Sequence, residues 1–256
     1  VEVVKEIRRL SKDAERRSKL APKTVDETVK WLNWQEYIEL VERLKEECTE
    51  VNPTSGRKRK PGGVAWSLQR YLVFAILACV PDRQRTLREL VVGKTLLKNA
   101  DGVYTIRHGP QDYKTGRIYG ERPVIALAVE LSPFIDRFIE MRVHLGQPEH
   151  EYLFTARNGA HSLTHRGLWQ LFTTTAYART GRHMNPHMIR DVAVTHFKRT
   201  NASESELDAL AMLMAHSVSM QRASYDRRSK DEKISPAVEL LKRAAITKTT
   251  KPPSPA

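Results

Sequence analysis

Residues 186–200 read Pro-His-Met-Ile-Arg-Asp-Val-Ala-Val-Thr-His-Phe-Lys-Arg-Thr. The apolar spacing predicts a helix over residues 187–200 that begins directly after a proline. His187 and Arg190 are three residues apart, so they share one face of the first turn, close to unpaired backbone N–H groups and the positive end of the helix dipole. That arrangement suits a phosphate group. Taken alone, however, a His-x-x-Arg pair is more often an accident of a polar surface, so its significance depends on the segments around it.

Downstream, Ala-His-Ser at residues 215–217 is followed by Tyr225, nine residues after His216 and 35 after Arg190 (225 − 190). The patterning predicts helices over residues 203–215 and 219–228. A lone tyrosine in a basic segment is usually an amphipathic surface residue, and a lone histidine is usually hydrogen-bonded within the fold. The spacing of the two relative to Arg190 is therefore more informative than either residue.

Upstream, two further basic positions stand out. Residues 103–106 and 123–127 have the composition of short β-strands, and the intervening Tyr-Lys-Thr-Gly-Arg at residues 113–117 predicts a hairpin with Lys114 at its tip. By default, such a lysine is an exposed turn residue. Arg83 and Arg85 follow a predicted buried helix, and an arginine there could point from the start of the next helix into a cleft.

These elements in this order resemble the signature of the tyrosine recombinase (phage integrase) family: Arg, Lys in a β-hairpin, His-x-x-Arg, Ala-His-Ser, and Tyr nine residues after that His. Residues 152–154 (Tyr-Leu-Phe) with residues 163–164 (Leu-Thr) also resemble the family segment before His-x-x-Arg. The resemblance covers roughly residues 31–230. It implies the integrase catalytic fold, which is mainly α with a small antiparallel β-sheet (α+β).

The resemblance also implies a role for each residue. Tyr225 attacks the scissile phosphodiester, forms a 3′-phosphotyrosyl link and releases a 5′-hydroxyl. Arg83 and Arg190 hold the two non-bridging oxygens.

For the other three positions, the resemblance implies that His216 donates a further hydrogen bond to the phosphate and that Lys114 protonates the leaving 5′-oxygen. His187 acts as a proton acceptor or as a further phosphate ligand.

The chemistry agrees with this assignment. A tyrosine free in water has a pKa near 10, so only about one in a thousand is ionised at neutral pH, and nearby cations favour the phenolate. Arginine suits phosphate because its planar fork matches two oxygens and it does not lose its proton. The arginines supply the charge that a metal would otherwise supply, so neither a cofactor nor a metal is expected. His161 and His165 could bind a metal if both lie on a helix, but no third ligand is apparent nearby.

The sequence departs from the family pattern at several positions. Arg83 has Leu90 seven residues on, as in the family, so it is favoured over Arg85 as the first catalytic arginine. The acidic residue often found three positions after that arginine is Thr86 here, and Pro-Asp at 81–82 replaces the usual Gly-Leu. What orients Arg83 therefore stays open.

A second departure follows Arg190, where many family members have a histidine and this chain has Asp191. Asp191 could orient His187, cap the helix, or act only through the helix dipole.

Composition bounds the function. The 256 residues are 40% hydrophobic, enough for a core, and Lys plus Arg total 43 against 30 Asp plus Glu, a formal charge of +13. Such an excess favours a polyanionic partner, DNA or RNA before an anionic membrane, since each neutralised phosphate releases counterions, although ordinary solubility charge is the alternative. The family resemblance implies that this partner is double-stranded DNA. No run of about 18 apolar residues occurs, so no membrane partner is expected.

Cys48 and Cys79 are expected to be free thiols, as is usual in a reducing compartment. The protein is accordingly predicted to lie in the cytoplasm of a bacterium, an archaeon or a phage-infected cell.

The predicted organisation has three parts. Residues 1–30 are a linker or the end of a truncated N-terminal DNA-binding domain, residues 31–230 are the catalytic domain, and residues 231–256 are a C-terminal arm with a helix near 235–246 and a disordered tail from 247. The resemblance implies that the arm docks on a neighbouring protomer in a homo-tetramer on DNA, unless it folds back on its own chain.

The leading prediction is a site-specific DNA recombinase. A type IB topoisomerase or a telomere resolvase shares the same chemistry and is the alternative enzyme. A non-catalytic DNA-binding protein on the same fold is the alternative outside enzymes.

Overall fold

The structure, a computed structural model, describes residues 2–20, 29–146 and 149–247. The turn predicted at residues 21–23 and the predicted disordered tail beyond residue 247 lie outside the described residues. In chain order the helices are α1 (Glu2–Leu20), α2 (Trp34–Glu46), α3 (Pro61–Cys79), α4 (Gln84–Arg88), α5 (Gly116–Tyr119), α6 (Ser132–Met141), α7 (His165–Thr180), α8 (Met188–Arg199), α9 (Glu204–Leu213), α10 (Val218–Met220) and α11 (Lys230–Thr247). The strands are β1 (Leu96–Lys98), β2 (Tyr104–Ile106) and β3 (Ile125–Ala126).

The main core is built around α3, which packs against α2, α6 and α7. Phe74 on α3 stacks on Phe172 of α7 with ring centroids 4.0 Å apart, and the Tyr37 hydroxyl of α2 donates to the Phe74 carbonyl. By length and composition α3 is apolar enough to cross a membrane, but two thirds of that stretch is buried inside the protein, as in the core helix of a soluble fold.

Helix starts follow the expected capping chemistry. Asn33 caps α2, because its side chain accepts from the Glu36 N–H while the Glu36 carboxylate accepts from the Asn33 N–H. Ser203 and Glu206 form the same reciprocal pair at the start of α9. These boxes set where the two helices begin.

The sheet is small and antiparallel, with strand order β1-β2-β3, so the predicted class of mainly α with one small antiparallel sheet is confirmed. The predicted hairpin is wrong in detail. Residues 107–124 connect β2 to β3 through a long segment that includes α5, and Lys114 lies in a turn before α5. Strand β1 was not predicted, because its three residues carry too short an alternation to be distinguished from a loop.

The C-terminal part of the described chain forms a second packing unit. Ala193, Val194, Met214 and Tyr225 form a buried cluster between α8, the end of α9 and the π-helical turn at Gln221–Tyr225. The helix predicted over residues 219–228 is confirmed as far as Tyr225, but it is α-helical only over Val218–Met220, continues as a π-helical turn over Gln221–Tyr225, and gives way to extended backbone at Asp226. The polar and basic residues of this segment are compatible with a helix, but they form no apolar face that would extend the helix beyond Tyr225.

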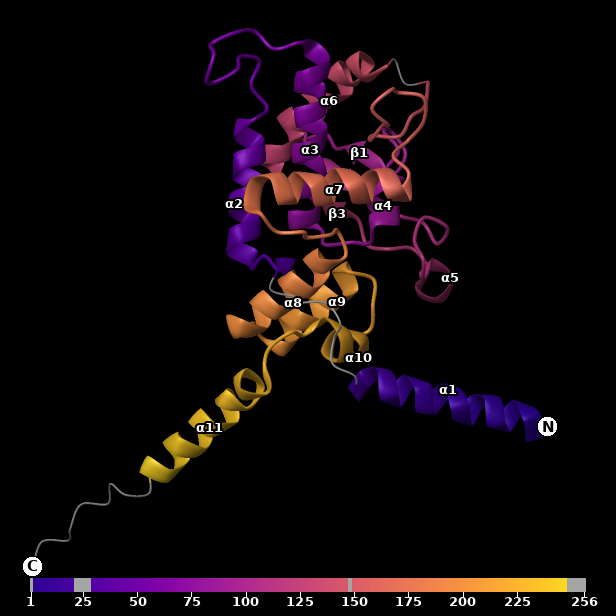
Figure 1. Ribbon diagram of the computed structural model, residues 1–256, viewed down its shortest axis with the longest axis vertical. Helices are drawn as coiled ribbons and strands as arrows, with labels where there is room; N and C mark the ends of the chain where they lie inside the picture. Colours follow the sequence, from indigo (N-terminus) through magenta and orange to yellow (C-terminus); the bar gives the residue numbers. More distant parts are fainter. Residues whose placement is uncertain (1, 21–28, 147–148, 248–256) are drawn as a thin grey trace, which may run out of the picture.

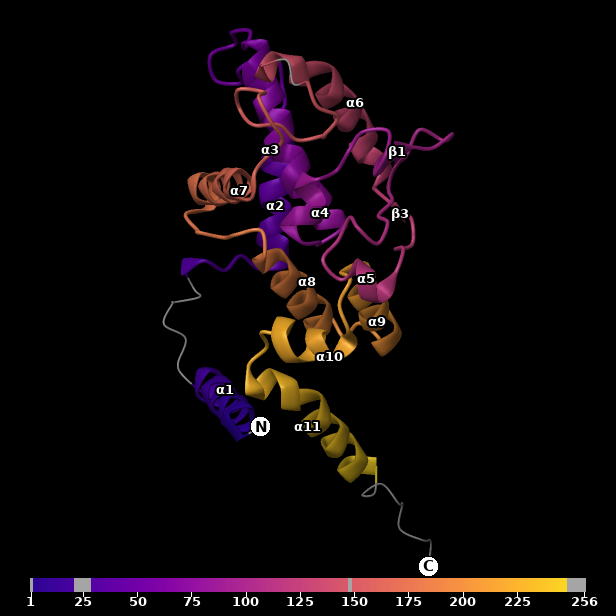
Figure 2. The ribbon, with the colours of Figure 1, turned by 90° about the vertical axis from the view of Figure 1, so that its right-hand side faces the viewer.

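Helices α1 and α11 extend away from this body on different sides (Figures 1 and 2). Helix α11 begins at Lys230, earlier than predicted, and its apolar residues Ile234, Leu240 and Leu241 are exposed. Helix α1 likewise leaves Val3, Ile7 and Leu10 exposed.

Candidate active site

Four chain segments converge beneath the core, where α4, α8 and the α9–α10 connection lie side by side (Figures 1 and 2). Arg83 is the residue before α4, Arg190 lies in the first turn of α8, His216 follows α9, and Tyr225 ends the π-turn. The structure thus brings together residues that are up to 142 positions apart (225 − 83).

Arg190 is the centre of this cluster. Its side chain is fully buried, at 0% exposure. Nη1 donates to the Pro81 carbonyl (3.1 Å), Nη2 lies 2.9 Å from the Met214 carbonyl and 2.6 Å from His216 Nδ1, and Nε lies 3.3 Å from the Tyr225 hydroxyl. Burial lowers the pKa of Arg190, yet a guanidinium keeps its proton in proteins, so the site holds a desolvated positive charge.

Tyr225 is only 6% exposed, and its hydroxyl points at Arg190. Its ring stacks on His216, with centroids 4.8 Å apart and planes 18° apart, and the Arg190 guanidinium lies 5.0 Å from the ring centroid. The Arg190 guanidinium therefore lies both against the phenol ring and at its oxygen, where it can stabilise negative charge that develops in the reaction.

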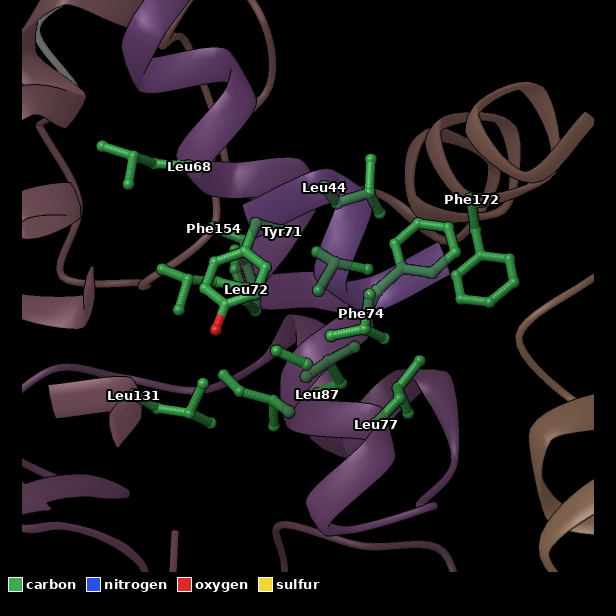
Figure 3. Close-up of a cluster of buried hydrophobic side chains, with 14 of the residues drawn as sticks. Leu44, Leu68, Tyr71, Leu72, Phe74, Leu77, Leu87, Leu131, Phe154 and Phe172 are labelled. Carbon is green, nitrogen blue, oxygen red and sulfur yellow. The ribbon is translucent and has the colours of Figure 1, made fainter. Parts of the chain in front are cut away.

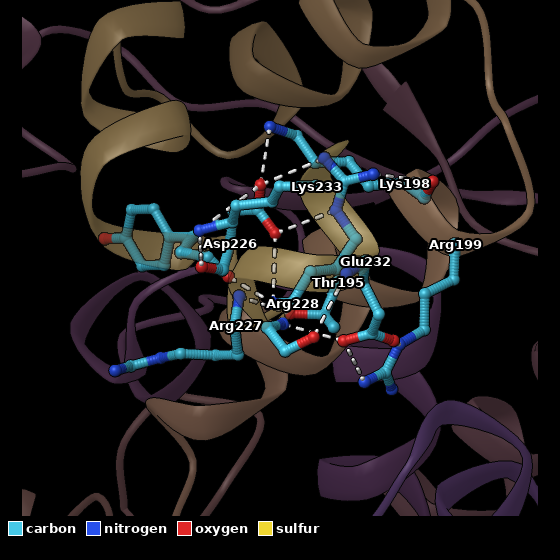
Figure 4. A network of polar contacts seen from close by, with 10 residues as sticks. Thr195, Lys198, Arg199, Asp226, Arg227, Arg228, Glu232 and Lys233 are labelled. Carbon is cyan, nitrogen blue, oxygen red and sulfur yellow. Dashed lines mark hydrogen bonds and ion pairs between the residues drawn. The ribbon is translucent and has the colours of Figure 1, made fainter. Parts of the chain in front are cut away.

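The backbone around Tyr225 is fixed to α8 (Figure 4). Thr195 Oγ1 donates to the Tyr225 carbonyl (3.3 Å) and accepts from the Arg227 N–H (3.0 Å). The Arg227 side chain pairs with Asp191 at 2.7 Å, so the acid that replaces the family's usual histidine anchors the segment that carries the tyrosine. Asp226 pairs with Lys198, which adds a second side-chain anchor on the same helix.

His216 is a preformed hydrogen-bond donor. Because Arg190 donates to Nδ1, the neutral ring carries its proton on Nε2. Burial, with the charges of Arg190 and Arg83, lowers the pKa of His216 to about 4, so the ring is neutral at physiological pH. Nε2 is buried and has no hydrogen-bond partner within the described chain. An unpaired buried donor is unfavourable, and an incoming phosphate oxygen would satisfy it.

Arg83 and Arg85 occupy different environments. Arg83 is half-buried and its Nη1 donates to the Ala215 carbonyl at 3.4 Å, next to His216. Arg85 is exposed and pairs with Glu89 at 2.9 Å. Arg83 is therefore the one that borders the cluster. Thr86, where an acid was expected, donates its hydroxyl to the Arg83 carbonyl and so orients the backbone of Arg83.

The two remaining sequence candidates lie at the edge of the cluster. The His187 ring is exposed and lies 6.0 Å from the Tyr225 ring, and desolvation by neighbouring atoms lowers its pKa, with Arg190 adding to the effect and Asp191 opposing it. Lys114 is exposed and makes no hydrogen bond or ion pair to any residue that the structure describes. Only its neighbour Thr115 reaches the cluster, donating to the Ala215 carbonyl at 3.4 Å.

Comparison with known proteins bears on the fold. No family model and no curated protein matches the chain. Among solved structures, XerH site-specific recombinase bound to palindromic difH substrate, in a post-cleavage complex, aligns with a TM-score of 0.57 and 18% identity, covering 82% of this chain and 52% of that one. XerA recombinase aligns with a TM-score of 0.55 and 13% identity, covering 86% of this chain and 66% of that one.

A third match is the Tn1549 transposon integrase in complex with transposon right end DNA, with a TM-score of 0.54 and 18% identity, covering 88% of this chain and 70% of that one. The chain has the tyrosine recombinase catalytic fold. It spans about half the length of the XerH chains.

Within this tyrosine recombinase fold, two residues near the cluster were not predicted as site residues. Asp82 is buried and accepts from the Arg83 N–H at 2.7 Å. Arg122 is buried and pairs with Asp82. The sequence marks Asp82 only as a departure from the family pattern, and nothing in the sequence around Arg122 distinguishes it from the other arginines of the chain.

Beside His216 the recombinase fold encloses a cavity of about 350 Å³, lined mainly by the segment 113–123 on one side and by Met212 and Ala215 on the other. The segment that carries Lys114 is therefore loosely packed against the cluster. In the part of the chain that the structure describes, no group of three or more His, Cys, Asp or Glu side chains is placed to hold a metal ion.

Proposed function

We propose that the chain is the catalytic domain of a site-specific DNA recombinase, which cuts and rejoins strands through a phosphodiester link to Tyr225. One observation carries this proposal: a single buried guanidinium, Arg190, contacts the Tyr225 hydroxyl and His216 at the same time, and the His216 Nε2–H beside it has no partner within the described residues. A tyrosine, a fixed cation and an unpaired neutral donor in one place make a phosphate site with a nucleophile in it.

The cleavage step balances as a transesterification. The Tyr225 oxygen attacks the phosphorus, the new O–P bond forms, the P–O5′ bond breaks, and a 3′-phosphotyrosyl link and a 5′-hydroxyl result. Arg83 and Arg190 stabilise the two negative charges that develop on the non-bridging oxygens, and His216 donates to one of them. Because the number of phosphodiester bonds is unchanged, the reverse attack by a 5′-hydroxyl rejoins a strand without an added energy source.

Two proton transfers accompany this step. The tyrosine proton leaves toward His187, whose pKa is lowered by desolvation from neighbouring atoms and by neighbouring cations, so that its ring is neutral and able to accept. Lys114 gives a proton to the leaving 5′-oxygen. The lysine is exposed on a segment that touches Ala215 through Thr115, so a DNA strand lying over the cluster would meet it from the outside.

Double-stranded DNA is the proposed partner. The chain carries a formal charge of +13, the matched XerH recombinase is bound to palindromic difH substrate, and the matched Tn1549 integrase is in complex with transposon right end DNA. Base-specific contacts depend on side-chain geometry at the DNA surface, so the target is to be found by experiment.

The test is covalent trapping on a library of duplexes with a randomised central stretch. The protein is incubated with the library and denatured in detergent, and protein-linked DNA is recovered and sequenced, with Tyr225→Phe in parallel. The proposal predicts adducts that are lost in Tyr225→Phe and that share one sequence. Adducts without any shared sequence would point to a topoisomerase instead, and binding without adducts would point to a non-catalytic DNA-binding protein.

We further propose that the enzyme works as a homo-tetramer on DNA whose contacts run through α11. Helix α11 projects from the body and exposes Ile234, Leu240 and Leu241, an apolar surface that a neighbouring copy would cover. Deleting residues 231–256 should reduce the mass of the protein–DNA assembly in light scattering while leaving adduct formation by each monomer. An unchanged mass would contradict the role of α11.

A further inference from the structure

The end of α9 is where three arginines meet. The carbonyls of residues 213–215 are consecutive, and each accepts from a different arginine: Arg122 donates to the first, Arg190 to the second at 2.9 Å, and Arg83 to the third at 3.4 Å. These carbonyls belong to the C-terminal end of a helix, which carries the negative end of the helix dipole. Side chains from three separate segments are thus oriented by one short piece of backbone.

The conformation of that backbone is itself unusual. Ala215 has φ +50°, in the left-handed region that residues other than glycine rarely adopt. Turning the chain there directs the third carbonyl toward Arg83 and places His216 directly beneath Arg190. An uncommon backbone conformation persists where surrounding contacts hold it, and the three arginines supply such contacts.

Asp82 joins two of these arginines. Its carboxylate pairs with Arg122 and lies 3.8 Å from Arg190 Nη1, and it also accepts from the Arg83 N–H at 2.7 Å. Both partners of the Asp82–Arg122 pair are buried. Asp82 thus contacts the guanidinium of Arg122 and the backbone of Arg83 and lies near the guanidinium of Arg190, so its charge offsets part of the repulsion between Arg122 and Arg190.

Arg122 joins this centre to the segment that carries Lys114. Its guanidinium lies 5.4 Å from the centroid of the Tyr113 ring, and Tyr113 directly precedes Lys114. The Tyr113 hydroxyl donates to the Gly120 carbonyl, which closes the loop between them. Arg122 therefore contacts both the end of α9, which determines the position of His216, and the loop that carries Lys114.

We propose that Arg122 and Asp82 are positioning residues for the reaction at Tyr225. Their buried ion pair holds the end of α9 in place, and through it the guanidinium of Arg190 and the ring of His216. The same pair holds the end of the loop that carries Lys114. This inference rests on the proposed recombinase function. Neither residue reaches the substrate, so each acts through the groups it holds.

The experiment uses Arg122→Lys and Arg122→Gln in the full chain, with the duplex recovered by trapping. Lysine keeps the charge but has no fork to bridge the Asp82 carboxylate and the helix end together. Both variants should form the Tyr225 adduct about 10- to 100-fold more slowly at saturating DNA, while the DNA concentration for half-maximal rate stays within about twofold, because displacement of catalytic groups affects the rate of chemistry and leaves ground-state binding largely intact.

A second readout does not depend on activity. The imidazole of His216 is followed by nuclear magnetic resonance as pH changes, in protein without DNA. If Arg122 holds the end of α9, both variants should raise the titration midpoint of His216 from about 4 toward 6.5, because the ring loses its burial and its fixed contact with Arg190.

The matched control is Glu47→Gln, which removes a partly buried carboxylate that pairs with Arg70 and Arg179, distant in sequence from the site residues. It should lower the melting temperature without moving the adduct rate or the His216 midpoint. Arg122 variants that fold, yet keep both the wild-type rate and the wild-type His216 midpoint, would overturn the inference. A wild-type protein that forms no adduct, with a His216 midpoint that does shift in the variants, would reject the recombinase proposal and leave the structural role of Arg122 standing.

Discussion

The two halves of the candidate site differ in how completely the chain builds them. Around Arg190, the guanidinium, His216 and Tyr225 are buried and in mutual contact, and the backbone of Tyr225 is tied to α8. Around Lys114, the ammonium is exposed, and a pocket of about 350 Å³ lies between part of its segment and Met212 and Ala215. Close packing holds one geometry, whereas a loosely packed loop can adopt several.

The contrast implies a division of labour. The buried half supplies charge stabilisation, which is most effective when it is fixed before the reaction and shielded from water. The exposed half supplies a proton, which needs only to arrive when the strand breaks. We therefore expect the two halves to respond differently to mutation and to changes in the substrate.

The largest effect is expected in the buried half. Arg190→Lys keeps the charge, but a lysine ammonium cannot donate hydrogen bonds to all four partners of the guanidinium at once. These partners are the Pro81 and Met214 carbonyls, His216 and Tyr225. Adduct formation should fall by about 10³-fold, the scale of losing a preorganised donor to a developing anion. Single-turnover adduct formation on detergent gels measures the rate. A loss of less than tenfold would mean that Arg190 is structural rather than part of the phosphate site.

The next effect distinguishes the exposed half. Lys114→Ala should slow adduct formation by about 10²-fold, the usual contribution of a general acid. A substrate whose scissile 5′-oxygen is replaced by sulfur should restore the rate, because a thiolate leaves without a proton. The same substrate should not restore Arg190→Lys. If sulfur rescues neither variant, or both, the assignment of Lys114 as the acid is wrong.

A smaller effect concerns stability. The pKa of His216 is about 4 in the folded protein against 6.5 ordinarily, so the unfolded chain binds the extra proton between these values. The contribution is fully present above pH 6.5 and is lost as pH falls toward 4, by about 2 kcal/mol at pH 5. Urea unfolding at pH 7 and pH 5 should show this loss in the wild type and a smaller loss in His216→Gln. Equal losses in both would show that His216 does not titrate as the buried geometry predicts.

The smallest effect separates the two candidate arginines. Arg85→Ala should leave the adduct rate within about twofold of the wild type, because Arg85 is exposed and its pair with Glu89 contributes about 0–1 kcal/mol. Arg83→Ala should slow the same reaction by about 10²-fold. If Arg85→Ala slowed adduct formation more than Arg83→Ala, the first catalytic arginine would be Arg85. The contact between Arg83 and the Ala215 carbonyl would then have no role in the reaction.

Sequence patterns predicted most of the buried half and little of the exposed half. Helical periodicity and the order of the basic residues predicted α8 and α9 and the segments that carry Arg190, His216 and Tyr225. The two strands on either side of Lys114 were predicted and pair as expected, but the long connection with α5 that replaces a tight hairpin turn was not, because a short polar segment carries no periodicity to detect.

Asp82 and Arg122 were missed for a different reason. Their pairing joins positions 40 residues apart (122 − 82), and a buried ion pair of this kind leaves no local pattern in the sequence. Asp191 was noticed but left with three possible roles, and only the tertiary structure shows its pairing with Arg227.

The most direct test of the account is to identify the linked residue itself. The trapped complex is digested with nuclease and trypsin, and the peptide Ala-Ser-Tyr-Asp-Arg at residues 223–227 is examined by mass spectrometry for an attached nucleotide. The account predicts a nucleotide joined through its 3′-phosphate to Tyr225. A nucleotide on Tyr113 or Tyr119, or on a residue other than tyrosine, would contradict it.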